Sequence, residues 1–389
     1  MNAQDGRPSS AQPTPRARML AAYRGEKLDR VAVAPEFWYY LPARLLGMNM
    51  IEFSRQIPFW KALQETFRHY RCEGWGAVFA GGGPGPFPSE SSETALAGGR
   101  IESRHVVHTP AGDLVSRSVQ DPTEPGWSLE RPIKDFEAHW PVYEQTALRD
   151  VAQYDWAPMQ RALDAVGEDY LLEFWAGVPF TDWIGGPRQG GFEQMVMDLL
   201  EREDYLLGLR ERYVAHSRAL IEAAFAHTTV RSVVIGCSWA CVSLLGARLW
   251  RKWDKPVIRA MVEAAHRAGG LVHIHLHGQC MELIPDVVEL GVDCICPMER
   301  PPGGDVTPER MAAVKNLTRG RLTLNGNVHT VETLIRGTPE DARREVRQII
   351  DAWADDGRLI VGTGDQVGGE TPDENIWAMI ETAKSYGRY

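Results

Sequence analysis

Three histidines recur at every second position of one apolar run, Leu271–Gly278. They are His273, His275 and His277. In a β-strand this spacing places all three imidazoles on the same face of the sheet. Imidazole titrates near neutral pH and binds metal ions through its neutral ring. A one-sided histidine stripe that ends in glycine therefore indicates a site for acid–base or metal chemistry.

The last two histidines of the run, His275 and His277, are the better candidates for metal ligands. An H-x-H at a strand end presents two side chains about 7 Å apart along the backbone, within reach of one ion. His273 lies two residues deeper, where a hydrogen-bonded core histidine is the simpler interpretation. A third ligand would come from elsewhere in the chain, and the candidates are Asp365, Glu173, Cys237 and Cys280.

The elements that must position these residues alternate between apolar strands and helical sequence. Such alternation predicts a parallel sheet covered by helices, and eight units predict an α/β protein with a (β/α)8 TIM barrel. A doubly wound sheet is the alternative, but no G-x-G-x-x-G follows the first strand and the sequence holds no Walker A motif. The predicted strands are 31–37, 77–80, 170–175, 232–239, 271–278, 292–298, 321–327 and 358–363.

One barrel domain is predicted over residues 17–389. Residues 1–16 are rich in Pro, Ser, Gln and Gly and are predicted to form a flexible N-terminal extension. A β-hairpin insertion is predicted at about 99–120, where two strand-like runs flank the turn Pro110–Asp113.

Polar residues stand at the predicted carboxyl ends of the strands, where barrels of this kind place their chemistry. Their convergence indicates a ligand, a metal ion or acid–base work, although a single carboxylate there could equally pair with a rim arginine. Nearby tryptophans could wall an apolar pocket. The polar residues are Glu36, Glu173, Cys237, His275, His277, Glu299, Asn325, Asn327 and Asp365, and the tryptophans are Trp38, Trp175, Trp183 and Trp239.

The composition bounds the class of protein. Of 389 residues, 44% are hydrophobic and 24% charged, which suits a globular protein with a large core. The net charge of −10 and the lack of a basic block argue against nucleic-acid binding. No apolar run approaches the ~20 residues of a membrane helix, and the first residues lack the apolar segment of a secretory signal. We therefore expect a cytoplasmic protein without a membrane partner, whose six cysteines are thiols.

Several motifs of the C-terminal half carry a family resemblance. They are Gly291–Asp293 before Pro301–Val306, Leu324–Val328, Thr333–Glu340, and Gly362–Asp365 before Thr371–Ile376. With them, the stretch from about residue 177 to 389 resembles the uroporphyrinogen decarboxylase superfamily. This resemblance implies a (β/α)8 barrel. The decarboxylases bind substrate carboxylates with an R-Q-A-G-R segment near the N-terminus, which is lacking here. The chain is thus nearer to the corrinoid-dependent zinc methyltransferases.

Those methyltransferases hold zinc with an H-x-C on strand five and a distant cysteine. The resemblance aligns these ligands with His275-Leu276-His277 and Asp365, so that histidine and aspartate replace both thiolates. Two imidazoles and a carboxylate make a harder, more Lewis-acidic centre than thiolates do. Such a centre argues against methylation of a thiol coenzyme and is compatible with methyl transfer from an ether or amine.

The sequence therefore predicts a metal-dependent methyltransferase that moves a methyl group from a small methylated ether or amine to a corrinoid or similar acceptor. His275, His277 and Asp365 would hold a divalent metal, with zinc expected first. Cobalamin would arrive on a partner corrinoid protein, because the chain has no D-x-H-x-x-G segment. We expect a homodimer, as relatives of this fold often pair.

The remaining candidates are assigned to the substrate. Glu36 or Glu173 would act as general acid or orient the substrate, and Asn325 would hydrogen-bond to it. The pocket would be shaped by Trp38, Trp175, Trp239 and Cys237. Two alternatives stay open: a decarboxylase or other metal-assisted lyase acting on a small organic acid, and a non-catalytic barrel that binds a small molecule.

Overall fold

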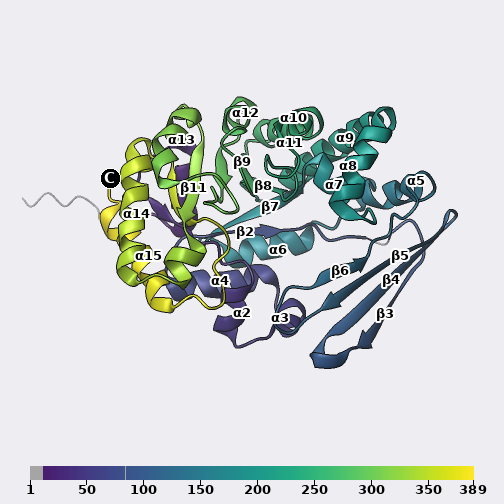
Figure 1. Ribbon diagram of the computed structural model, residues 1–389, viewed down its shortest axis with the longest axis horizontal. Coiled ribbons are helices and arrows are strands. Elements are labelled where there is room, and N and C mark those ends of the chain that lie inside the picture. Colours follow the sequence, from purple (N-terminus) through teal and green to yellow (C-terminus); the bar gives the residue numbers. More distant parts are fainter. Residues whose placement is uncertain (1–11, 84) are drawn as a thin grey trace, which may run out of the picture.

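The computed structural model describes residues 12–83 and 85–389. Figure 1 shows a curled sheet with helices along its outer side and a smaller sheet set apart at one edge of the molecule. The predicted N-terminal extension falls largely on residues 1–11, outside the described residues, and helix α1 begins at Pro15. In the described part of the chain, no helix combines the length and apolar character needed to cross a bilayer.

Eight parallel strands form the curled sheet, in the order β1-β12-β11-β10-β9-β8-β7-β2. This is the strand order around a (β/α)8 barrel, and each of the eight predicted strands corresponds to one of them. The strands are β1 Ala32–Val33, β2 Trp75–Val78, β7 Leu171–Gly177, β8 Ser232–Cys237, β9 Leu271–Leu276, β10 Cys294–Cys296, β11 Thr323–Val328 and β12 Leu359–Thr363.

The helices follow the strands as the alternating pattern predicts. Helix α14 shows the capping residues typical of a helix N-terminus. Thr338 and Asp341 form a capping box, and Pro339 takes the first helical position. The helices are α1 Pro15–Arg24, α2 Tyr40–Leu46, α3 Met50–Gln56, α4 Phe59–Tyr70, α5 Phe136–Ala147, α6 Ala157–Val166, α7 Phe180–Gly185, α8 Gly191–Glu201, α9 Glu203–His227, α10 Ala247–Trp253, α11 Lys255–Arg267, α12 Ile284–Leu290, α13 Met311–Thr318, α14 Pro339–Trp353 and α15 Asp373–Tyr386.

The two faces of the curled sheet have different compositions. Alternate residues such as Phe174, Ile235 and Ile274 join the large hydrophobic core that includes the helices. The residues between them, such as Leu171 and Val234, form a smaller cluster inside the curl. The same alternation along β9 turns the histidines inward.

A buried carboxylate connects the two edge strands of the curled sheet. No ladder of backbone hydrogen bonds joins β1 to β2 among the described residues. Glu73, just before β2, accepts a hydrogen bond from the backbone N–H of Val33 in β1 at 2.9 Å. It also pairs with Arg18 at 2.6 Å and with Arg30 at 2.7 Å. Side chains thus connect the edges where the strands do not.

The smaller sheet is antiparallel and lies between β2 and β7 in the sequence. Its central strands, β4 (Ile101–Thr109) and β5 (Gly112–Gln120), form a hairpin where one was predicted. The sequence analysis did not predict the flanking strands β3 (Ser89–Ala95) and β6 (Trp127–Glu130). Every residue of β3 is exposed, so it lacks the alternation of apolar and polar residues that marks a half-buried strand.

Candidate metal centre

His273 occupies the inner end of the histidine stripe and is fully buried. Its Nδ1 lies 2.9 Å from the Glu173 carboxylate, and its Nε2 lies 2.9 Å from the Cys296 sulfur. The hydroxyl of Tyr23, from α1, donates to Glu173 at 3.3 Å. Both ring nitrogens therefore have partners deep inside the curl. The interpretation of His273 as a hydrogen-bonded core histidine is confirmed.

His275 lies one layer nearer the carboxyl ends of the strands. Its Nδ1 faces the Cys296 sulfur at 3.0 Å, and its Nε2 lies 2.8 Å from Nε2 of His277. Burial, followed by the neighbouring imidazoles of His277 and His273, holds the pKa of His275 well below its usual value. Burial also raises the pKa of the Cys296 thiol far above its usual range, so the thiol stays neutral. A neutral His275 leaves its Nε2 free to bind a metal ion.

His277 lies at the outer end and is partly exposed. Its Nδ1 is 2.6 Å from the Glu299 carboxylate. Burial alone would lower the pKa of His277, but the hydrogen bond to Glu299 and the charges of Asp365, Glu299 and Glu36 raise it to about 9. When a metal ion displaces the proton on Nε2, a carboxylate on Nδ1 holds the ring with Nε2 toward the ion, an arrangement typical of metal-binding histidines. Glu299 is therefore suited to orient His277.

Carboxylates gather around the two histidines. Glu36, which follows β1, is buried, and one of its oxygens lies 3.9 Å from His275 Nε2. Burial and then the charge of Asp365 raise the pKa of Glu36 to about 8, against the opposing effect of His277. Burial likewise raises the pKa of Asp365. Like charges crowded into a partly buried space favour the binding of a cation, which removes their repulsion.

The donor atoms form two adjacent groups of three, in each of which the atoms lie within 4.8 Å of one another. One consists of Glu36, His275 and Cys296, and the other of His277, Glu299 and Asp365. Because the two histidine Nε2 atoms are 2.8 Å apart, the groups adjoin at that pair. Two nitrogens on one tetrahedral zinc ion would be about 3.3 Å apart, so a small separation of the rings would admit the ion. The imidazole and carboxylate donors fit zinc and other divalent transition metals.

Of the three predicted metal ligands, His277 and Asp365 belong to one group and His275 to the other, which it joins through the 2.8 Å contact with His277. Two further predicted residues are placed differently from our expectation. Glu173 lies deeper, bound to His273, and Cys237 lies in the core between sheet and helices, where Cys280 also packs. Both cysteines are buried in that core, and neither belongs to the two groups of donor atoms.

Asn325 and Trp239 have contrasting surroundings. Asn325 is buried on β11, and its side-chain nitrogen has no hydrogen-bond partner among the described residues. Trp239 packs against Phe192 at 6.0 Å and lies under the guanidinium of Arg131, beside α8. It does not line the cavity described below.

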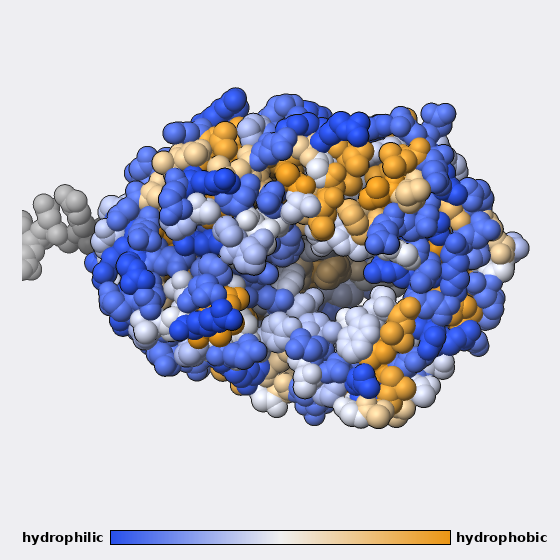
Figure 2. All heavy atoms as spheres, in the orientation of Figure 1, coloured by the Kyte–Doolittle hydropathy of each residue, from blue (hydrophilic) through white to orange (hydrophobic). Residues whose placement is uncertain are grey.

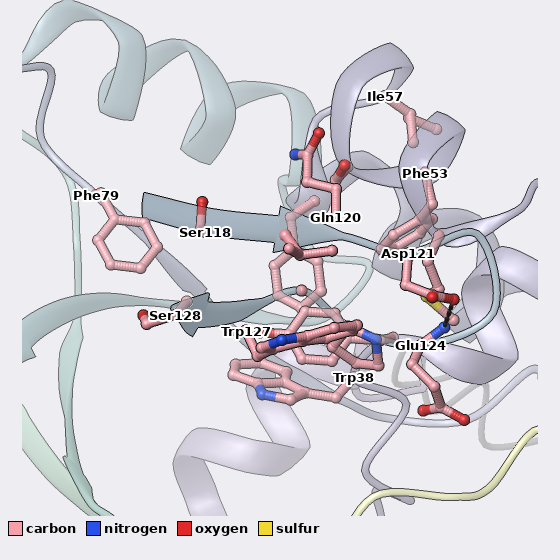
Figure 3. A pocket seen from close by; sticks show the side chains of 18 of the residues that line it. Trp38, Phe53, Ile57, Phe79, Ser118, Gln120, Asp121, Glu124, Trp127 and Ser128 are labelled. Atoms are coloured by element: carbon pink, nitrogen blue, oxygen red, sulfur yellow. Dashed lines mark hydrogen bonds between the residues drawn. The ribbon is translucent and has the colours of Figure 1, made fainter. Parts of the chain in front are cut away.

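A cavity of about 790 Å³ lies between β2 and β7 of the curled sheet and strands β5 and β6 of the smaller sheet. The face in Figure 2 is hollowed near its middle, between the two sheets. Trp38 and Trp175 line the cavity, as predicted for the substrate pocket. Phe79 and Trp127 line it as well, and Figure 3 shows Phe79 across the cavity from Trp38 and Trp127.

Aromatic rings in contact, tilted or edge-on to one another, connect this cavity to the histidines. Trp38 contacts Trp75 with ring centroids 5.2 Å apart, and Trp75 lies 5.5 Å from His275 and 4.7 Å from His273. Sequence reasoning missed Trp75, Cys296 and the partnership of Glu299 with His277. Only the pairing of β9 with β10, which sets Cys296 opposite His275, could have identified the cysteine.

Comparisons with known proteins show the family and the fold of this chain. A methylcobamide:CoM methyltransferase, MtbA, from Methanosarcina mazei is 25% identical over 173 residues, which are 44% of this chain and 46% of MtbA. The chain thus matches about half the length of that curated relative. A solved structure, a methyltransferase from Methanosarcina mazei, shares the fold with a TM-score of 0.64 and 17% identity, over 96% of this chain and 99% of the other. Residues 177–386, more than half of the sequence, match the family described as Uroporphyrinogen decarboxylase (URO-D), and the chain belongs to that family.

Proposed function

We propose that this protein is a metal-dependent methyltransferase that takes a methyl group from a small methylated ether or amine and passes it to a corrinoid carried by a partner protein. The observation that carries the proposal is the convergence of His275 and His277 with three carboxylates next to an aromatic cavity. The family and the methyltransferase relatives support it. Zinc is the first expected metal, and a homodimer the expected assembly.

In the proposed site His275, His277 and Asp365 hold the metal, and Glu299 fixes the ring of His277. A bound divalent cation supplies Lewis acidity that stabilises the electron pair of the departing oxygen or nitrogen. Trp38 and Trp175 exclude water from the methyl group and hold the donor in the cavity. These residues place the donor while the acceptor attacks its methyl carbon.

Glu36 is the proposed proton donor. Its carboxyl is buried, which raises its pKa and favours the protonated form, and it lies 3.9 Å from His275 Nε2. When the carbon–oxygen bond of an ether breaks, the electron pair stays on oxygen and the Glu36 proton neutralises it. Glu173 is less suited to this role, because it is fully buried and already bound to His273 and Tyr23. It supports the inner histidine.

Asn325 is the remaining candidate for contact with a ligand. Its buried side-chain nitrogen has no partner within the described ranges, and an amide in that state can donate to a bound group. A carboxy-lyase in the same fold would need cationic partners for a substrate carboxylate. No described residue that lines the cavity is Lys, Arg or His. The cavity therefore favours the methyltransferase over the lyase.

The test combines metal content with methyl transfer. Protein purified without chelator or histidine tag should contain about one equivalent of a divalent transition metal. It should demethylate simple methyl ethers or amines with cob(I)alamin as acceptor. The variant His275→Ala with His277→Ala should lose both metal and transfer, whereas His105→Ala, at an exposed position of strand β4, should keep both. Less than about a tenth of an equivalent of metal in the unmodified protein would refute the assignment.

A further inference from the structure

The walls of the cavity are unusually rich in aromatic rings. Trp38 packs edge-on against Phe59 at 4.8 Å, and Phe79 lies over Trp175 at 5.9 Å. Phe79 is 58% exposed and Trp127, on β6, is 42% exposed, although both are large apolar side chains. Aromatic surface left open to solvent in a cavity indicates a binding site.

The charged side chains that line the cavity are acidic. They are Asp121 and Glu124, and no described lining residue is Lys, Arg or His. Arg55 and Arg100 lie outside the lining, where Arg55 donates to Gln120 and Arg100 acts on Asp121. Figure 3 shows both carboxylates at the end of the cavity where Trp38 and Trp127 lie.

The two carboxylates are held in place by local hydrogen bonds. Asp121 accepts from the backbone N–H and the hydroxyl of Thr123 at 2.8 and 2.7 Å. Glu124 accepts from the Tyr40 hydroxyl at 2.7 Å. None of these hydrogen bonds comes from a positively charged group, so neither acid forms a direct ion pair through them. The hydrogen bonds from Thr123, and last the charge of Arg100, lower the pKa of Asp121, so its carboxylate is negatively charged beside the rings.

We propose that this cavity is a binding site for a quaternary methylammonium cation, which would be the methyl donor of the proposed function and to that extent rests on it. The face of an aromatic ring attracts a cation, and tryptophan does so best. The negative charges of Asp121 and Glu124 add to that attraction, whereas they oppose an anionic substrate. A neutral methyl ether would gain from the apolar walls alone.

Methyl transfer from such a donor needs only one other reactant, the corrinoid acceptor. An electron pair of the acceptor's nucleophilic metal forms the new bond to the methyl carbon. The carbon–nitrogen bond breaks with its electron pair going to nitrogen, and a neutral tertiary amine leaves.

The experiment measures binding to the full-length protein by isothermal titration calorimetry with two probes. One is choline, and the other is its uncharged carbon isostere, in which a tert-butyl group replaces the trimethylammonium group. We expect choline to bind at least about tenfold more tightly, equivalent to about 1.4 kcal/mol. Trp127→Leu, at an exposed position, should remove this preference while the isostere binds as before, and Glu124→Gln should weaken choline alone.

The matched control is Leu129→Ala, which lies on the same strand as Trp127, is 44% exposed and does not line the cavity. It should leave both affinities unchanged. Equal binding of choline and its isostere, or a choline preference that survives Trp127→Leu, would overturn the inference. Methyl transfer from ethers without choline binding would refute the inference and leave the proposed function standing. Selective choline binding without any methyl transfer would support the cation site and refute the proposed function.

Discussion

The carboxylate of Glu73 offers the sharpest test of how the curled sheet is held together. Glu73 is 1% exposed and receives hydrogen bonds from Arg18, Arg30 and the backbone of Val33. Glu73→Gln keeps the side-chain length and one acceptor oxygen but removes the negative charge. Breaking a buried ion pair by altering one partner costs about 3–5 kcal/mol. Arg18 keeps Asp29 as a second partner, so we expect about 3 kcal/mol.

Glu73→Ala should cost more. It also leaves the buried N–H of Val33 without an acceptor, which adds about 1–3 kcal/mol. The assay is urea unfolding followed by circular dichroism, with the free energy of unfolding compared among variants. Glu65→Gln is the control, because Glu65 forms an exposed pair with Arg68 at 3.4 Å and should change stability by less than about 0.5 kcal/mol. A loss below about 1 kcal/mol for Glu73→Gln would refute the role given to this carboxylate.

Three further predictions concern the metal centre and a buried acid elsewhere. Glu299→Gln should weaken metal affinity about 10–100-fold, because Gln cannot hold the His277 ring as a carboxylate does. The control Glu309→Gln, at an exposed site, should leave metal affinity unchanged. Equal metal affinities of Glu299→Gln and the unmodified protein in a chelator competition would exclude the proposed orienting role. At a free metal concentration a thousandfold above the dissociation constant, bound metal stabilises the fold by about 4 kcal/mol, so chelation should lower the free energy of unfolding by that amount. An unchanged midpoint of thermal unfolding after chelation would count against a specific site. Burial raises the pKa of Asp254 to about 8, so the folded state keeps a proton that the unfolded state releases above about pH 4. The free energy of unfolding should therefore fall as pH rises from about 4 to 8, and Asp254→Asn should lack that fall. Parallel curves of unfolding free energy against pH for the two proteins would contradict the assignment.

Sequence periodicity was sufficient for the strands but not for their side-chain partners. The histidine spacing predicted that the three imidazoles share one face of the strand, and β9 turns His273 and His275 into the curl. The partners of each ring come from other strands, and their positions depend on register. Cys296 lies opposite His275 because β9 and β10 pair with these residues in line, a fact of tertiary structure that no local pattern contains.

Small errors in strand boundaries also had consequences. The second strand was predicted to begin at residue 77, whereas β2 begins at Trp75. Trp75 was therefore not considered as an inward residue, although it contacts both inner histidines. Strand β3 escaped prediction for a different reason, since both of its faces meet solvent and no apolar stripe was needed. Hydrophobic periodicity predicts a strand through its buried face, so a strand without a buried face cannot be predicted in this way.

The cavity and the metal ligands come from separate stretches of the chain. The last cavity-lining residue in the described sequence is Trp175, whereas His275, His277 and Asp365 all lie within the family match at 177–386. Natural variation can therefore alter the cavity through residues 38–175 while His275, His277 and Asp365 stay unchanged. Substrate range and reaction chemistry can evolve at different rates in such a chain. Relatives should be compared in two parts, residues 177–386 for the candidate histidine and aspartate ligands and residues 36–175 for the proposed proton donor and the cavity.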